Sequence, residues 1–75
     1  MSTIAMEYAR YAEQVLPVNA GDEQKRETKR AFYAGARSLH LALMQSETEE
    51  AALTLCEKLE VEFATFRTAV LEGKA

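Results

Sequence analysis

Residues 25–40 read KRETKRAFYAGARSLH, and this stretch of the 75-residue chain decides the fold that the sequence predicts. Apolar or small side chains recur here at spacings of three and four residues, and the repeat continues just beyond the stretch. They are Thr28, Phe32, Gly35 or Ala36, Leu39 and Leu43. This spacing is typical of the packed face of an amphipathic helix. It predicts a long helix over residues 22–45.

A shorter helix is expected on the N-terminal side of this segment. Its apolar positions again lie three and four residues apart, at Ile4, Tyr8, Tyr11 and Val15. Ser2 or Thr3 can cap its first turn with a side-chain oxygen, and Pro17 cannot continue a helix. The pattern therefore predicts a helix over residues 3–16, followed by a Pro-Val-Asn-Ala-Gly connection.

A third helix is expected over residues 48–72. Its apolar side chains keep the same spacing throughout, at Ala52, Cys56, Leu59, Phe63, Phe66 and Val70. The segment Ser46-Glu-Thr-Glu49 fits a capping box at its start, and Thr48 is the alternative cap. Gly73 is expected to stop the helix.

The connection between the last two helices is short, so they are expected to run antiparallel as a hairpin. The sequence thus predicts an all-α fold, a single domain of residues 1–75 with a short N-terminal helix and a long helical hairpin. The basic second helix would face the acidic third one, with Arg37 opposite Glu57 and Arg30 opposite residues 62–64. Exposed pairs of this kind contribute ~0–1 kcal/mol each, so the apolar stripes drive folding.

A chain of this length buries little surface and usually needs a disulfide, a metal or a partner chain. The single cysteine, Cys56, excludes an internal disulfide, and its place on the apolar stripe predicts a buried, unreactive thiol. A lone cysteine also fits a reducing, intracellular setting. No Cys, His or carboxylate cluster has metal-ligand spacing, and no cofactor is expected. The expected supplement is assembly into a homo-oligomeric helical bundle.

Charge and composition argue against several classes of function. The net charge of −3 disfavours bulk nucleic-acid binding, which needs a positive surface. No apolar run approaches the ~20 residues of a membrane span, and the N-terminus lacks the basic and apolar regions of a signal peptide. The carboxylates follow a solvated helix face without a paired acid and base. An enzyme is therefore not expected.

A second stripe on the basic helix carries the candidate binding residues. Spaced four, three, four and three residues apart, they are Arg26, Arg30, Tyr33, Arg37 and His40. A row of guanidinium groups can hold phosphates through forked hydrogen bonds, and an aromatic ring can stack on a base. The stripe thus predicts an anion or nucleotide surface. The alternative is that these arginines pair with Glu57, Glu60 and their neighbours on the acidic helix.

Gly35 also needs a reason, because a glycine inside a helix costs roughly 1 kcal/mol relative to alanine. It lies between Ala34 and Ala36, in a segment poor in side-chain atoms where another helix backbone can approach closely. We expect that helix to belong either to the same chain or to a second one.

The segment Lys29-Arg-Ala-Phe-Tyr-Ala-Gly-Ala-Arg-Ser-Leu resembles small phage and prophage helical-hairpin proteins of unassigned function. In these, a basic residue precedes Phe-Tyr-Ala-Gly-Ala or a near variant, and an acidic partner helix follows. Glu60-Val-Glu-Phe-Ala-Thr-Phe is similar to the Glu-rich, Phe-containing second arm of the same hairpins. The likeness covers roughly residues 25–70, so the first helix lies outside it.

The resemblance implies a phage origin and an oligomeric helical hairpin. By analogy with small phage proteins that counter host immunity, the protein is expected to act in the cytoplasm of the host bacterium as an anti-defence factor. Several helical-hairpin phage proteins look like sponges for nucleotide second messengers. By this analogy, the stripe from Arg26 to His40 would sequester a cyclic or ADP-ribose-type nucleotide in a symmetric oligomer. The alternatives are an inhibitor that binds a host defence protein directly and a small structural or assembly protein.

Overall fold

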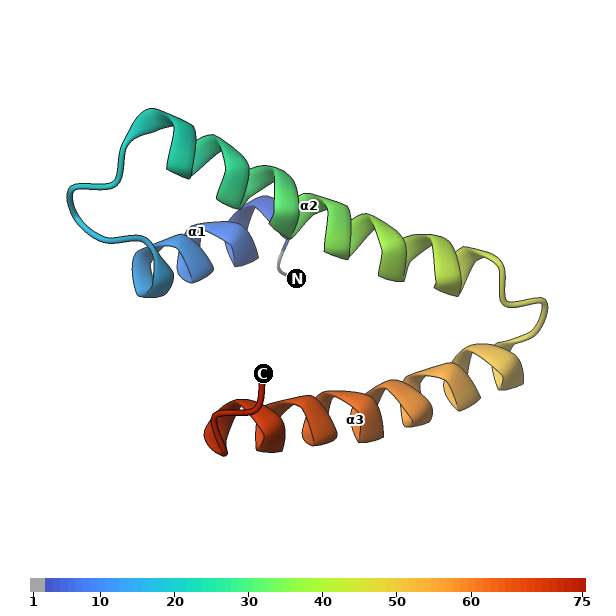
Figure 1. Ribbon diagram of the computed structural model, residues 1–75. Helices are drawn as coiled ribbons and strands as arrows, with labels where there is room; N and C mark the ends of the chain where they lie inside the picture. Colours follow the sequence, from blue (N-terminus) through green and yellow to red (C-terminus); the bar gives the residue numbers. More distant parts are fainter. Residues whose placement is uncertain (1–2) are drawn as a thin grey trace. The chain divides into compact units, whose positions relative to one another are not determined.

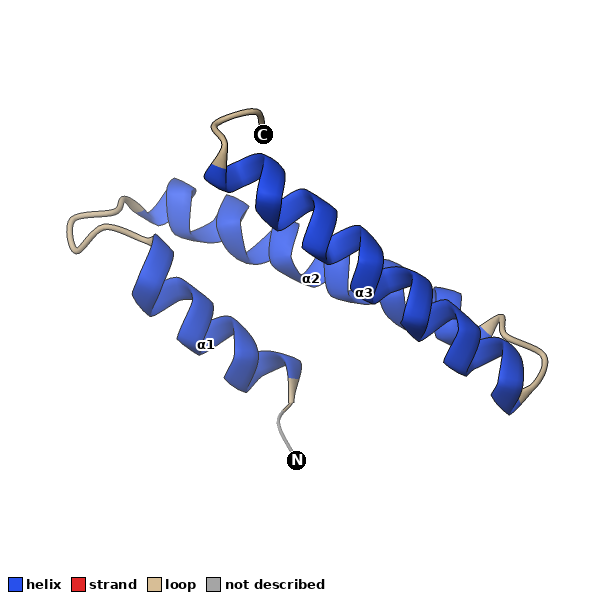
Figure 2. Cartoon of the chain, turned by 90° about the horizontal axis from the view of Figure 1, so that it is seen from below, coloured by secondary structure: helices blue, strands red, loops and turns tan. Residues whose placement is uncertain are grey.

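The computed structural model describes residues 3–75, and in that range it contains three α-helices and no strand (Figures 1 and 2). The helices are α1 (Ile4–Val15), α2 (Asp22–Met44) and α3 (Glu49–Leu71). The predicted all-α class is confirmed, and each helix begins and ends within one residue of its expected range. None of these helices has both the length and the apolar character that crossing a membrane requires.

The chain divides into two compact units, Met1–Leu41 and Ala42–Ala75, and each is described by itself. The first unit contains α1 and most of α2. The second contains the last turn of α2 and all of α3. The antiparallel hairpin, the single domain and the homo-oligomer stay predictions.

The first helix begins at a threonine cap and ends ahead of a proline. Thr3 is extended, and its Oγ1 accepts a hydrogen bond of 3.2 Å from the Met6 amide, which satisfies one free donor of the first turn. The alternative cap, Ser2, lies outside the described residues. At the other end the Leu16 amide donates to the carbonyl of Ala12 at 3.0 Å, and Pro17 follows. Proline lacks the amide that another turn would need.

Four aromatic side chains hold the first unit together by joining α1 to α2. The Phe32 ring lies 5.4 Å from that of Tyr8 and 5.1 Å from that of Tyr11, measured between centroids. The Tyr33 ring lies 6.2 Å from that of Tyr8 and 6.4 Å from that of Phe32. The Tyr8 hydroxyl also donates to the carbonyl of Lys25, at 3.5 Å. The first helix therefore packs on α2 through edge-on and tilted ring contacts, the arrangement that aromatic pairs prefer.

The start of α3 corrects one prediction. Thr48, not Ser46, is the N-cap: its Oγ1 accepts a hydrogen bond of 3.0 Å from the amide of Ala51. The capping box at Ser46 is wrong, because the Ser46 hydroxyl donates back to the carbonyl of Ala42 at 3.2 Å. That bond belongs to the end of α2, so Ser46 closes one helix and Thr48 opens the next.

The end of α3 is a Schellman motif, as the glycine predicts. Gly73 has φ of 75°, in the left-handed region where a side chain is strained. Its amide donates to the carbonyl of Val70 at 3.0 Å, and the Lys74 amide donates to that of Ala69 at 2.8 Å. These two bonds satisfy carbonyls that the helix itself leaves free.

The two hydroxyls near the start of α3 should respond differently to substitution. Thr48→Ala removes the cap and is expected to lower the free energy of unfolding by about 1 kcal/mol. Ser46→Ala removes a bond to one of the last carbonyls of α2, which water can satisfy at this half-buried helix end, so we expect a loss of a few tenths of a kcal/mol. Urea unfolding followed by circular dichroism, at one protein concentration, measures both. A larger loss for Ser46→Ala than for Thr48→Ala would contradict the cap assignment.

No residue from 3 to 75 is buried, and the most enclosed ones are only half-buried. Cys56 is exposed, so the prediction of a buried thiol is wrong. The half-buried side chains near it on α3 are Ala52, Leu55 and Leu59. The half-buried face of the helix therefore includes Leu55 in place of Cys56.

Gly35 lies in open space. A Cβ added there would meet no atom within 4 Å among the described residues, apart from its own helix backbone and chain neighbours. A tight crossing with α1 is therefore not observed, and one with α3, which belongs to the other unit, stays a prediction. The crossing with a second chain stays a prediction.

Candidate functional site

The five candidate residues line two hollows on the first unit. One hollow, of about 380 Å³, is lined by Arg26, Lys29, Arg30 and Tyr33. The other, also of about 380 Å³, is lined by Ile4, Tyr33, Ala36, Arg37 and His40. Tyr33 belongs to both, so the stripe is divided by one aromatic ring into a half with Arg26 and Arg30 and a half with Arg37 and His40. The helix α1 contributes Ile4 to the second half.

The Tyr33 ring packs on one side against the aromatic cluster of α1 and α2. Its helical position suggests a face separate from the core, yet its ring approaches both Tyr8 and Phe32. The residue remains 38% exposed. Its ring is thus anchored on one side and open on the other, which is the arrangement that a stacking platform needs.

Arg37 and His40 are joined to each other. The Arg37 Nη1 atom lies 3.1 Å from Nδ1 of His40, one turn further along α2. A guanidinium group only donates, so the imidazole must accept at Nδ1 and carry its proton on Nε2. This leaves an N–H group of His40 and the other donors of Arg37 free to reach a ligand.

Few carboxylate groups lie close to the basic side chains of the two hollows. Arg30 Nη1 lies 3.9 Å from Oε1 of Glu27, and both side chains are about two-thirds exposed or more, at 73% and 67%. An exposed pair of this length is worth little. Within residues 3–41, Arg26, Lys29 and Arg37 have no carboxylate oxygen within 4.0 Å. The predicted alternative, pairing with Glu57 and Glu60 of α3, would join the two units and stays a prediction.

Lys29 is a member of the site that the spacing argument missed. Its Nζ lies 5.8 Å from the centroid of the Tyr8 ring, a cation–π distance. It lines the first hollow and also a neighbouring one of about 540 Å³ beside Tyr8 and Leu16. The contact with Tyr8 depends on how α1 packs, which a stripe drawn on α2 alone does not contain. Its spacing of four residues from Tyr33 was the one available signal.

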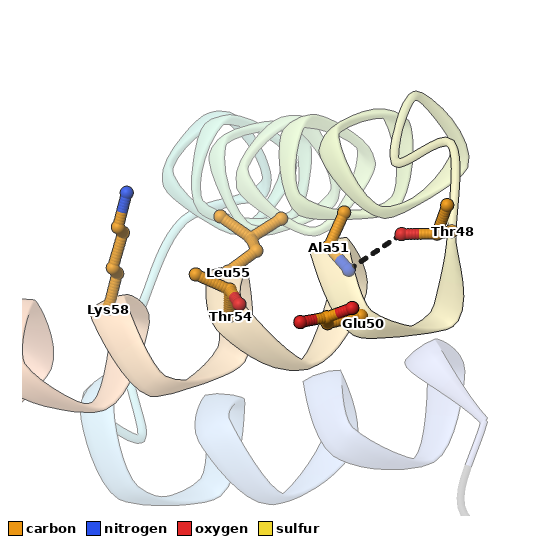
Figure 3. A pocket seen from close by; sticks show the side chains of 6 residues that line it. All are labelled: Thr48, Glu50, Ala51, Thr54, Leu55 and Lys58. Carbon is orange, nitrogen blue, oxygen red and sulfur yellow. Dashed lines mark hydrogen bonds between the residues drawn. The ribbon is translucent and has the colours of Figure 1, made fainter.

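The second unit has a hollow of its own, at the start of α3 (Figure 3). It measures about 480 Å³, and its lining is Thr48, Glu50, Ala51, Thr54, Leu55 and Lys58. The positive end of a helix often binds anions through free amides. Here the amide of Ala51 already donates to Thr48, as the dashed line in Figure 3 marks, and the Glu50 carboxylate stands beside it. This hollow is a poor anion site.

The described residues contain no group of three or more His, Cys, Asp or Glu side chains placed to hold a metal ion. No family model matches the chain, and neither a curated protein nor a solved structure matches it. The two hollows beside Tyr33 are therefore the features of the structure that point to a function.

Proposed function

We propose that the protein binds a phosphate-bearing nucleotide along the stripe from Arg26 to His40 and sequesters it without changing it chemically. The observation that carries this proposal is the arrangement around Tyr33. One open aromatic ring separates two hollows. The first is lined by three cationic side chains and the second by Arg37 and His40, and neither lining contains a carboxylate.

This arrangement suits a ligand with more than one anionic group. Guanidinium groups bind phosphate oxygens through two parallel hydrogen bonds, and the Tyr33 ring offers a face for a base. From Arg26 to Arg37 the stripe extends roughly 16 Å at the helical rise of 1.5 Å per residue. A cyclic di- or trinucleotide or an ADP-ribose derivative has phosphates and bases spread over a comparable length.

The biological role is the part of the proposal that rests on resemblance. The Phe-Tyr-Ala-Gly-Ala segment and the acidic second arm suggest a phage protein acting inside a bacterium. There, binding a nucleotide second messenger of host immunity without hydrolysing it would suppress the defence response. A sequestering protein needs affinity and abundance, and it needs no catalytic group.

The site is tested by removing one guanidinium from the half with His40. Arg37→Ala takes away the forked donor and its bond to His40, and we expect roughly 10- to 100-fold weaker nucleotide binding. Calorimetric titration with cyclic dinucleotides, cyclic trinucleotides and ADP-ribose derivatives measures it. Arg10→Ala is the matched control, because Arg10 is an exposed arginine of α1 that lines neither hollow and pairs with Glu7 at 3.5 Å.

Two outcomes would overturn the proposal. One is a folded wild-type protein that binds none of these nucleotides. The other is binding that Arg37→Ala leaves unchanged, because the ligand would then lie elsewhere.

The same stripe also supports a second candidate function, the direct binding of a host defence protein. Tyrosine and arginine are the residue types that dominate protein interfaces, and here Tyr33 lies exposed among arginines. An acidic surface on the partner would complement them. A pull-down from bacterial lysate with one stoichiometric protein and no bound nucleotide would favour this function over sequestration.

A further inference from the structure

The apolar stripe of α3 is exposed along its C-terminal half. The Phe63 side chain is 58% exposed and that of Phe66 is 61% exposed, and Val70 beside them is also exposed. With Leu59 and Cys56 they keep the alternating spacing of three and four residues, which is the repeat of a two-helix seam. Large aromatic side chains in such a seam indicate a contact surface.

The aromatic side chains of unit 1 already have partners inside that unit. Phe32 packs on both Tyr8 and Tyr11 of α1, and Tyr33 lies at the edge of the same cluster. They are therefore engaged without any contribution from α3. With no buried residue from 3 to 75, the chain gains little from burial to set against the entropy of ordering itself, and further apolar contact would stabilise it.

The charges beside the stripe match a second copy of the same helix. Glu60 and Arg67 lie on one flank of the stripe, seven residues and roughly 10.5 Å apart at the helical rise. Neither has an ion-pair partner within 4.0 Å in unit 2. If two α3 helices cross antiparallel about a two-fold axis between residues 64 and 65, Glu60 of each copy lies about two residues, or roughly 3 Å along the helix, from the point opposite Arg67 of the other, an offset that these long side chains can span. The same rotation sets Phe63 of each copy against Phe66 of the other.

We propose that α3 is the self-association surface of this protein, packed antiparallel on α3 of a second copy. The charge distribution favours this order. Residues 49–60 carry four glutamates and one lysine, whereas residues 61–74 carry two glutamates, one arginine and one lysine. A parallel pair would hold the two acidic halves side by side, and the antiparallel pair keeps them at opposite ends. A two-fold contact of this kind is the commonest way in which identical chains assemble.

Charge exchange across the axis tests the proposal with the full chain. Glu60→Arg replaces two attractive pairs per dimer with two repulsive ones, and we expect about tenfold weaker dimerisation, as does Arg67→Glu. The double variant Glu60→Arg/Arg67→Glu restores both pairs and should return the dissociation constant to near the wild-type value. Sedimentation equilibrium over a range of protein concentrations measures all four proteins.

Glu57→Arg is the matched control, because Glu57 lies on the face of α3 away from the stripe and changes the net charge equally. It should dimerise like the wild type. Phe66→Glu should abolish dimerisation, and circular dichroism shows whether its helices persist as monomers. Equal weakening by Glu57→Arg and Glu60→Arg, or a double variant no better than the single ones, would overturn the proposal.

The orientation has a separate test in Cys56, which is exposed. In a parallel pair the two Cys56 thiols lie side by side, whereas in the antiparallel pair they lie far apart along the helices. Mild oxidation should therefore yield no disulfide-linked dimer, and its rapid formation would overturn the antiparallel order. Self-association through α3 is independent of the nucleotide site on α2, so a silent calorimetric screen leaves this prediction standing.

Discussion

Replacing Phe32 with alanine is expected to lower the free energy of unfolding by about 3 kcal/mol. Phe32 is the ring that both Tyr8 and Tyr11 contact, so the substitution removes the main link between α1 and α2. The estimate is at the lower end for a phenylalanine because the residue is half-buried. Small domains have only about 5–15 kcal/mol of stability in total, so the variant should be largely destabilised at growth temperature.

Phe32→Leu is the matched control for this prediction. It keeps most of the apolar volume and loses the ring contacts, so we expect a loss below about 1.5 kcal/mol. Urea unfolding at one protein concentration compares the three proteins, because dimerisation makes stability depend on concentration. A Phe32→Ala protein that unfolds at the wild-type urea midpoint would show that the aromatic cluster does not hold α1 in place.

The helices follow from local rules, which is why the sequence predicts them so closely. Pro17 and Gly73 end helices through their own backbone chemistry, and the cap at Thr3 needs only its neighbours. The error at Ser46 has the same local origin. Two hydroxyls lie two residues apart, both can cap, and the choice depends on whether α2 takes one of them for its own last turn.

The partners of each helix are a different matter, because packing depends on distant residues. Phe32 lies on the apolar stripe of α2, which the predicted hairpin would turn toward α3, and its observed contacts are with α1. Spacing along α2 shows that Phe32 packs and does not show on what. The exposure of Cys56 has the same cause. The half-buried face of α3 contains Leu55, one position before Cys56, and spacing along α3 does not distinguish the two.

The candidate site was predictable to the extent that one helix determines it. Arg26, Arg30, Tyr33, Arg37 and His40 share a face through the period of α2 alone. The Tyr33 ring, which separates the two hollows, is in contact with the ring of Tyr8 on α1. Lys29 also contacts the Tyr8 ring, so its position in the site depends on α1 as well. The contacts that α1 makes with the site could therefore not be predicted from the spacing of residues along α2.

Reversing two charges of the stripe should have the largest effect on binding. We expect Arg30→Glu/Arg37→Glu to weaken nucleotide binding by at least about 1,000-fold. Each half of the site loses a forked donor, which leaves Arg26 in the first half and none in the second, and each gains a carboxylate that repels phosphate. Both positions are exposed on α2, so the helix content should be unchanged. The Arg30→Glu change places a second carboxylate one turn from Glu27, which should lower the free energy of unfolding by a few tenths of a kcal/mol.

The control variant must carry the same net charge, so that the loss of specific contacts can be distinguished from the effect of the protein's overall charge on an anionic ligand. Arg10→Glu/Lys58→Glu changes the charge equally at two positions that line neither hollow beside Tyr33. Because neither position lines a hollow beside Tyr33, this variant should bind within a few-fold of the wild type. Calorimetry at two salt concentrations compares them. Equal losses in both double variants would mean that the ligand responds to overall charge, and that the hollows beside Tyr33 are not its site.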